Sequence, residues 1–253
     1  MADTPRGSES PEYYDQIYGE KDYAGEAARI VDLIEARVPS ATTLLDVACG
    51  TGRHLEHLST RFTCEGVDVS PDLLERARHR CPDVPFTVGD MATFDLQRTF
   101  DVVTCLFSAI GYTRTPDGLR AAVSAMARHV APGGLLVVEP FVQPDEWNDG
   151  RVSAETPVND GDRALVRLVT SGRDGDIAIL DMHYLSARGT DVSYSHERLH
   201  IGLFTWDQIV EAFEEAGLDD VTLDTEGLIG RGLVVGSRPQ HRTPAHNPSV
   251  PPS

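Results

Sequence analysis

The chain has 253 residues, of which 40% are hydrophobic and 25% charged, and this composition fits a globular protein with room for one full α/β domain. Its formal net charge of −18 argues against a nucleic-acid-binding protein, because binding to phosphates depends on basic surface. We see no signal-peptide leader and no apolar run long enough to span a bilayer, so we expect no membrane partner. The four cysteines follow no disulfide or metal pattern, which predicts reduced thiols and a cytoplasmic location.

The first 150 residues alternate between apolar runs and helical patterns. Residues 1–10 are polar, and we expect them to be disordered. Within 11–150, strands are predicted at 41–48, 63–69, 84–90, 100–107 and 133–140. Helices are predicted at 53–60, 71–80 and 116–130. This alternation predicts an α/β core whose parallel sheet is covered on both faces.

The pattern changes after about residue 150. Three segments within 151–204 alternate apolar and polar residues between Gly/Asp turns, which predicts antiparallel strands with one solvent-exposed face. Residues 205–236 return to the core, with a helix that Thr205 caps and Gly217 ends, followed by two short strands. Residues 237–253 are rich in proline and predict a disordered tail. The fold predicted is an α/β sheet with an antiparallel insertion after its fifth strand.

The first predicted strand ends in the turn Gly50-Thr51-Gly52, directly before a helix. Such a turn places backbone N–H groups and the positive end of a helix dipole at the carboxyl edge of the sheet. The dinucleotide fingerprint needs a third glycine where this chain has the bulky Leu55, and a P-loop needs a Gly-Lys-Ser/Thr ending that is absent. Both departures disfavour a nicotinamide cofactor and a P-loop nucleotide.

Acidic residues stand at the ends of the next two predicted strands. Asp68 ends the second strand, where a carboxylate can accept hydrogen bonds from ribose hydroxyls. Asp90 follows the third strand, where it can accept the adenine amino group while Met91 covers the ring. Together with Asp46, before the glycine turn, these residues predict an adenosine-binding edge. Asp46 and Asp90 could instead only order their turns.

Four motifs in sequence order, LLDVACGTG, GVDVS, GDM and APGGLLVVEP, resemble those of class I S-adenosylmethionine-dependent methyltransferases over residues 14–236. The resemblance implies a Rossmann-like sheet with S-adenosyl-L-methionine as cofactor. It implies that Gly50 and Gly52 approach the methionine part, Asp68 holds the ribose and Asp46 orients the glycine loop. It also implies cofactor contacts from an N-terminal lid and from further strand ends, namely Tyr14, Tyr23, Ala48, Val69, Asp90, Met91, Leu106 and Phe107.

Other segments, including YYDQIYGEKDYAGEA, FSAIGY, VVEPFVQPDEW and GLIGRGLVVG, resemble the bacterial N,N-dimethyltransferases of nucleotide-linked amino-deoxysugars of the desosamine and mycaminose type. This resemblance implies N-methyl transfer to an amino sugar that is carried on a nucleoside diphosphate, typically dTDP, in antibiotic biosynthesis. It further implies a homodimer, with the insertion serving both the substrate site and the subunit contact.

Candidate acceptor residues lie after the fourth and fifth strands, in the insertion and near the end of the core. Tyr112 is expected near the amine, and a tyrosine with a pKa of ~10 is a poor base at neutral pH, so we expect it to orient the amine. Glu139 could hold the amine or the sugar, or only order a turn. Candidates for the sugar and the diphosphate are Phe141, Trp147, Arg173 and Arg231. No His/Cys/Asp cluster has the spacing of metal ligands, so we expect no metal.

Two alternatives stay open. The acceptor could be another small-molecule amine or hydroxyl, for example on a glycoside that is already attached to its aglycone. The chain could also bind the cofactor without catalysis, although the acceptor-side residues Tyr112 and Glu139 speak against this. The position of the amino group on the sugar does not follow from the sequence.

Overall fold

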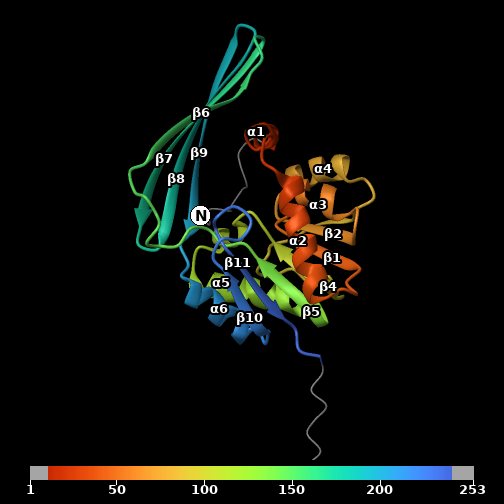
Figure 1. The fold of residues 1–253 in the computed structure, drawn as a ribbon. Helices are drawn as coiled ribbons and strands as arrows, with labels where there is room; N and C mark the ends of the chain where they lie inside the picture. Colours follow the sequence, from red (N-terminus) through yellow and green to blue (C-terminus); the bar gives the residue numbers. More distant parts are fainter. Residues whose placement is uncertain (1–10, 241–253) are drawn as a thin grey trace, which may run out of the picture.

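The computed structural model describes residues 11–240, so the disorder expected for 1–10 and 241–253 lies outside the described part of the chain. Two sheets organise the described residues. The larger has seven strands in the order β10-β11-β5-β4-β1-β2-β3, and the smaller has four in the order β6-β7-β8-β9. Figure 1 shows the smaller sheet rising from one side of the larger, helix-covered layer. The α/β sheet with an antiparallel insertion after β5 is therefore confirmed.

The parallel part of the larger sheet consists of short strands, which are mostly buried except for the edge strand β3. In spatial order these are β3 (Phe86–Val88), β2 (Thr63–Asp68), β1 (Thr43–Val47), β4 (Phe100–Cys105) and β5 (Val130–Val138). Beyond β5, β11 (Leu233–Ser237) and β10 (Asp219–Asp224) continue the sheet in the antiparallel sense. Gly134 lets β5 approach β4, because a Cβ there would lie 2.4 Å from the Asp101 carbonyl oxygen.

Helices cover both faces of this sheet and bury a separate core on each. One face carries α2 (Tyr23–Arg37), α3 (Arg53–Leu58) and α4 (Pro71–Arg80), and the other carries α5 (Pro116–Arg128) and α6 (Trp206–Glu215). Ser70, Thr115 and Thr205 cap α4, α5 and α6, and Thr205 completes a capping box with Gln208. Within residues 11–240, no helix is long and apolar enough to cross a membrane.

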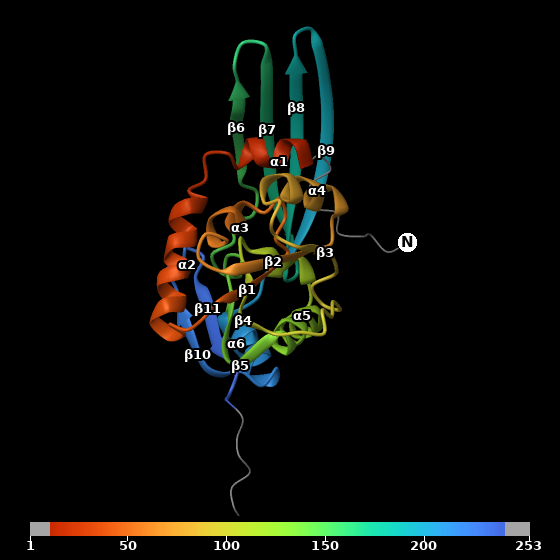
Figure 2. The same cartoon turned by 90° about the vertical axis from the view of Figure 1, so that its right-hand side faces the viewer.

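The insertion has one strand more than the sequence predicts. Its strands are β6 (Val152–Asn159), β7 (Arg163–Asp174), β8 (Ile177–Arg188) and β9 (Asp191–Gly202). The prediction missed β6 because this strand contains Pro157 and shifts its register between Glu155 and Val158, which removes the apolar alternation. Both features are typical of an edge strand. The inner face of the insertion packs on the N-terminal helix α1 (Pro11–Ile17), as Figure 2 shows.

The core also extends further than expected at its end. We placed the start of the tail at residue 237, but Ser237 belongs to β11 and pairs with Leu135. Arg238 then exchanges backbone hydrogen bonds with the turn at Gly133 and Gly134, with N–O distances of 2.7 and 2.9 Å. The proline-rich composition that suggested a tail begins only after these pairings.

Candidate active site

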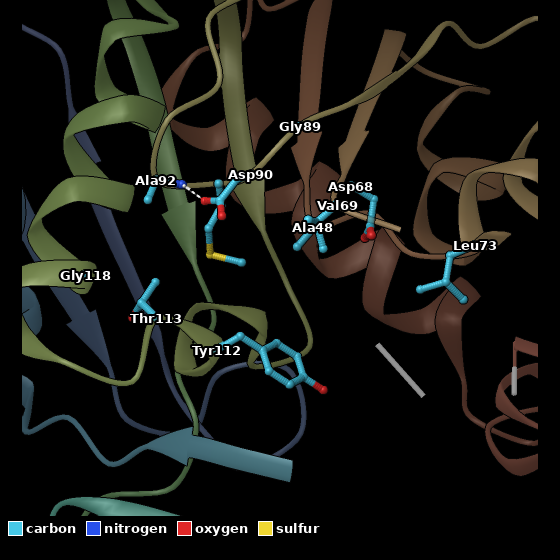
Figure 3. A pocket seen from close by; sticks show the side chains of 11 residues that line it. Ala48, Asp68, Val69, Leu73, Gly89, Asp90, Ala92, Tyr112, Thr113 and Gly118 are labelled. Atoms are coloured by element: carbon cyan, nitrogen blue, oxygen red, sulfur yellow. Dashed lines mark hydrogen bonds between the residues drawn. The ribbon is translucent and has the colours of Figure 1, made fainter. Parts of the chain in front are cut away.

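The carboxyl ends of β2 and β3 and the short helix η1 (Ala109–Thr113) surround a cavity of about 240 Å³. Figure 3 shows its side chains coming from these separate elements toward one space. The lining residues are Ala48, Asp68, Val69, Leu73, Gly89, Asp90, Met91, Ala92, Tyr112, Thr113 and Gly118. Strand ends far apart in the sequence thus meet where open α/β sheets bind their ligands.

A second, smaller pocket adjoins the first at Ala48 and follows the glycine loop. It is lined by Tyr14, Tyr23, Asp46, Ala48, Cys49, Gly50, Thr51, Arg53, His54, Leu106 and Phe107. The two pockets together contain all but one of the residues predicted to contact the cofactor. The exception is Gly52.

The two glycines of the loop serve different purposes. Gly50 has a φ of +55°, and a Cβ at this residue would meet no atom within 4 Å, so its backbone faces open space. Gly52 has a φ of +76°, and a Cβ there would lie 3.3 Å from the Ala77 Cβ, where α3 packs on α4. Gly50 is therefore open to a ligand, whereas Gly52 is required by packing.

Asp68 connects the glycine loop to the end of β2. Its Oδ2 accepts a hydrogen bond from the Gly50 N–H at 2.8 Å, and its Oδ1 accepts one from the Ser70 N–H at 2.9 Å. Burial raises the pKa of Asp68, and these N–H groups oppose the shift. Each carboxylate oxygen keeps a further lone pair, so Asp68 can also accept ribose hydroxyls.

Asp46 lies in the smaller pocket and is 2% exposed. Its Oδ1 accepts a hydrogen bond from Thr104 Oγ1 at 2.7 Å. Burial raises the pKa of Asp46 to about 6, although His54 and Thr104 oppose the shift. Asp90 differs, because its Oδ1 accepts the Ala92 N–H at 2.8 Å and orders the turn after β3 while the residue still lines the cavity.

Helix α1 lies against the glycine loop, and sequence reasoning missed the contacts that hold it there. Asp15 accepts hydrogen bonds from Thr51 Oγ1 at 2.8 Å, from Arg53 Nε at 3.2 Å and from Arg80 Nη2 at 2.8 Å. Burial alone would raise the pKa of Asp15, but these partners outweigh it and lower the pKa. The residues lie far apart in the chain, so no local motif could have indicated them.

The predicted catalytic residues take two different positions. Tyr112 lines the larger cavity, and burial raises its pKa well above the usual value, so its hydroxyl stays protonated. Glu139 is fully buried and lines neither pocket. Its Oε2 accepts the Phe107 N–H at 2.6 Å. This bond holds Phe107 at a φ of 54°, a left-handed conformation that residues other than glycine rarely adopt.

Of the four predicted substrate residues, Arg231 and Phe141 lie together beside Phe107. The Arg231 guanidinium is 5.4 Å from the Phe141 ring centroid and 5.8 Å from that of Phe107, and it donates to Ser108 Oγ at 2.9 Å. Trp147 packs 5.7 Å from Phe141, and its Nε1 donates to the Gly172 carbonyl at 3.2 Å. Trp147 thus joins its loop to the insertion.

Arg173 is engaged by its own turn, where it pairs with Asp176, and by the loop after β5. Its Nε donates to the Gly175 carbonyl at 2.5 Å, and its Nη1 donates to the Pro144 carbonyl at 2.8 Å. By contrast, none of the carboxylates in residues 11–240 forms an ion pair with Arg231. Over the same residues, no group of three or more His, Cys, Asp or Glu side chains could hold a metal ion.

Comparisons with known proteins agree with this geometry. A profile of the methyltransferase domain matches residues 44–134. The chain is 43% identical to dTDP-3-amino-3,4,6-trideoxy-alpha-D-glucopyranose N,N-dimethyltransferase of Streptomyces venezuelae, over 85% of this chain and 91% of the relative. It is 40% identical to dTDP-4-amino-2,3,4,6-tetradeoxy-D-glucose N,N-dimethyltransferase of Saccharopolyspora spinosa, over 89% and 91%.

This chain belongs to the S-adenosylmethionine-dependent sugar N-methyltransferases. The structure of CalS10, an amino pentose methyltransferase from Micromonospora echinaspora with bound S-adenosylmethionine, supports the assignment. It is 38% identical, covers 92% of this chain and 99% of its own, and superimposes with a TM-score of 0.82.

The two pockets of this sugar N-methyltransferase fit its cofactor. The open space beside Gly50 would take the methionine part, and the larger cavity, with Asp68 and Asp90 in its lining, would take the adenosine. When bound, S-adenosylmethionine supplies a methyl group on a positively charged sulfur. The buried carboxylates Asp46 and Asp68 favour such a cation electrostatically.

We expect Asp68→Asn to weaken S-adenosylhomocysteine binding by a factor of about 10 or more. The amide has one acceptor oxygen in place of two, so it cannot accept the hydrogen bonds of the loop and those of the ribose together. Isothermal calorimetry measures the change. Asp72→Asn, an exposed substitution in α4, serves as the control and should leave the affinity unchanged. Equal affinities of the Asp68 variant and the wild type would contradict the assignment.

The raised pKa of Asp46 predicts a pH dependence of S-adenosylmethionine binding. The cofactor is a cation, so it binds better to the ionised carboxylate, which is lost as the pH falls through about 6. Affinity should therefore drop about fourfold from about pH 7.5 to about pH 5.5 if only the ionised form binds. In Asp46→Asn, binding should be weaker at the higher pH, and this drop should be absent. A drop of the same size in both proteins would place the titrating group elsewhere.

Proposed function

We propose that this enzyme transfers two methyl groups, in successive reactions, to the amino group of a dTDP-linked amino-deoxyhexose in antibiotic sugar biosynthesis. Support comes from the two relatives at 43% and 40% identity, whose names give a 3-amino and a 4-amino dTDP-sugar as substrates. The observation in this chain that carries the proposal is Arg231, an arginine without an ion-pair partner among the described residues, placed beside the cofactor pockets.

Arg231 fits the diphosphate of such a substrate. An arginine fork binds phosphate oxygens bidentately, and this one uses Nη1 only for a neutral hydroxyl, Ser108 Oγ. Stacking on Phe107 and Phe141 orients the guanidinium without neutralising it. In a chain with a net charge of −18, a cation held in this way gives a local binding site for an anionic substrate.

Catalysis in this proposal rests on alignment. The acceptor nitrogen must approach the methyl carbon in line with the bond to sulfur, and holding it there supplies most of the rate enhancement. The protonated Tyr112 hydroxyl accepts a hydrogen bond from the amine and orients it, and it does not act as a base at neutral pH. The amine therefore loses its proton to water before transfer. Glu139 acts indirectly, by holding Phe107 in place.

The outer face of the insertion supports a homodimer, which we include in the proposal. Six apolar side chains there are between 37% and 66% exposed: Val152, Val166, Leu168, Leu185, Val192 and Tyr194. Strand alternation directs them away from the face that packs on α1. A flat patch shared by several strands can pair with its own copy about a two-fold axis. The four buried free cysteines are consistent with a reducing, cytoplasmic compartment.

Mass spectrometry tests the acceptor directly. Incubation with S-adenosylmethionine and a dTDP-linked 3-amino or 4-amino deoxyhexose should add one methyl group and then a second. The free aglycone, its amino glycoside and a simple amine serve as parallel acceptors. Methylation of one of these, with none of either dTDP-sugar, would overturn the proposal.

Two arginine variants test the diphosphate contact. Arg231→Met should raise the KM for the dTDP-sugar by a factor of about 10 to 100, because it removes a charge-assisted contact to phosphate. Arg173→Met is the matched control, since that arginine is engaged by carbonyl groups, and its KM should change less than about twofold. The reverse ranking of the two variants would place the diphosphate at the insertion turn.

The dimer prediction concerns the outer face. The double variant Leu185→Arg/Tyr194→Arg should be monomeric by light scattering, whereas Leu223→Arg, at a residue of 38% exposure on β10, should keep the mass of the wild type. A wild type that is itself monomeric, or a double variant that remains dimeric, would contradict the proposed interface.

A further inference from the structure

Helix α1 bridges the cofactor pockets and the insertion. It has 7 residues, too few for a helix to be stable alone in water, so its position depends on contacts with its neighbours. Figures 1 and 2 both show it between the insertion sheet and the α3–α4 side of the core. On the core side, Asp15 holds it to Thr51, Arg53 and Arg80. The contacts on the other side join the helix to the insertion.

Two tyrosines make the contacts with the insertion. Tyr13 Oη lies 2.7 Å from Ser186 Oγ, and its ring centroid lies 5.8 Å from that of Tyr184. Tyr18, directly after α1, accepts a hydrogen bond from Arg167 Nη1 at 3.2 Å, and the guanidinium lies 5.4 Å from the centre of its ring. Tyr18 is thus held by one cation, both at its hydroxyl and at its ring face.

Arg167 is an unusual residue for a sheet interior. It is 8% exposed and lies on the inner face of β7, where its Nη2 donates to Glu155 Oε1 at 2.7 Å. Its Nε is buried and has no hydrogen-bond partner among the described residues. Burying an arginine is costly unless its donors are satisfied, and a leucine would pack here at lower cost. The guanidinium therefore has a role beyond filling space.

The Tyr18 ring, which Arg167 contacts, packs in turn against two residues of the smaller pocket. Its centroid lies 4.9 Å from that of Tyr14 and 5.0 Å from that of Phe107, in an edge-on contact with the latter. Tyr14 and Phe107 both line the smaller pocket, beside Gly50. A continuous row of contacts thus runs from Glu155 and Arg167 in the insertion through Tyr18 to the methionine end of the cofactor site.

We propose that Arg167 is a positioning residue for methyl transfer, which holds Tyr18 against Tyr14 and Phe107 and so joins the N-terminal lid to the insertion. The proposed diphosphate contact, Arg231, stacks on Phe107, and a cofactor in the smaller pocket would contact Phe107 and Tyr14. Each ligand would therefore stabilise residues against which Tyr18 packs. The two ligands then raise each other's affinity by the same factor, as linkage requires. The nature of the second ligand rests on the proposed function, whereas the link between lid and insertion does not.

Calorimetry measures this coupling. S-adenosylhomocysteine is titrated into the full chain with and without saturating dTDP, which stands for the nucleotide part of the substrate. We expect dTDP to raise the affinity about fivefold or more in the wild type, a typical coupling between sites. In Arg167→Met and in Tyr18→Phe the factor should fall toward 1. Arg163→Met, an exposed arginine on the same strand paired with Asp160, should behave as the wild type.

A second measurement follows the lid without any nucleotide. Lys21 is the only lysine of the chain and lies between α1 and α2, where it pairs with Glu26 and stands 4.7 Å from the Phe107 ring centroid. Its acylation by an amine reagent, located by peptide mass spectrometry, reports how often this region opens. With S-adenosylhomocysteine bound, acylation should be about fivefold faster in Arg167→Met than in the wild type, the factor expected for one lost hydrogen bond.

Steady-state kinetics separates positioning from general stability. Arg167→Met should lower kcat more than it raises the KM for the acceptor, and Arg167→Lys, which keeps one charge and a donor for Tyr18, should recover part of the loss. Unchanged acylation of Lys21 in Arg167→Met would overturn the proposal. If dTDP does not bind the wild type, the proposed acceptor class is wrong, and the acylation result alone decides whether Arg167 holds the lid.

Discussion

The hydrogen bond from the Gly50 N–H to the Asp68 carboxylate is the interaction on which the site depends. It ties the loop after β1 to the end of β2, and it keeps the Gly50 backbone facing open space. A buried carboxylate that accepts two backbone N–H groups is held in a single orientation, so its remaining lone pairs are fixed before any ligand arrives. The carboxylate thus orders the loop and keeps acceptor lone pairs at the edge of the larger cavity.

The charged side chains around the two pockets suit a reaction that transfers a positive charge. Methyl transfer moves a positive charge from sulfur to nitrogen, and the carboxylates and protonated tyrosines in the pocket lining would stabilise a cation on either atom. The cations of the region include Arg53, which lines the smaller pocket. Arg53 and Arg80 are engaged with Asp15, and Arg167 is paired with Glu155, whereas Arg231 forms no ion pair among residues 11–240.

The sequence predicted those parts of the site that come from strand ends. Asp46, Asp68 and Asp90 follow apolar runs, and the topology of a parallel sheet brings such residues together without further information. Contacts between distant elements carry no such periodic signal. Asp15 in α1 contacts Arg80 in α4, and Arg167 in β7 contacts Tyr18 after α1. The partners lie far apart in the sequence, and only the tertiary fold brings them together. The sequence could not indicate that Arg173 donates to the Gly175 and Pro144 carbonyls, because a turn arginine looks the same in sequence whether or not it is already bonded.

Ala48, Phe107 and Ser108 hold left-handed backbone conformations at the ends of β1 and β4, although none is a glycine. Conformations of this kind cost on the order of 1–3 kcal/mol each, so the fold is less stable than its core alone would make it. Substitutions that relieve these backbone conformations would raise the thermal stability but lower turnover, because Ala48 and Phe107 line the smaller pocket. Gains in heat resistance are better sought in α6, none of whose residues lines either pocket.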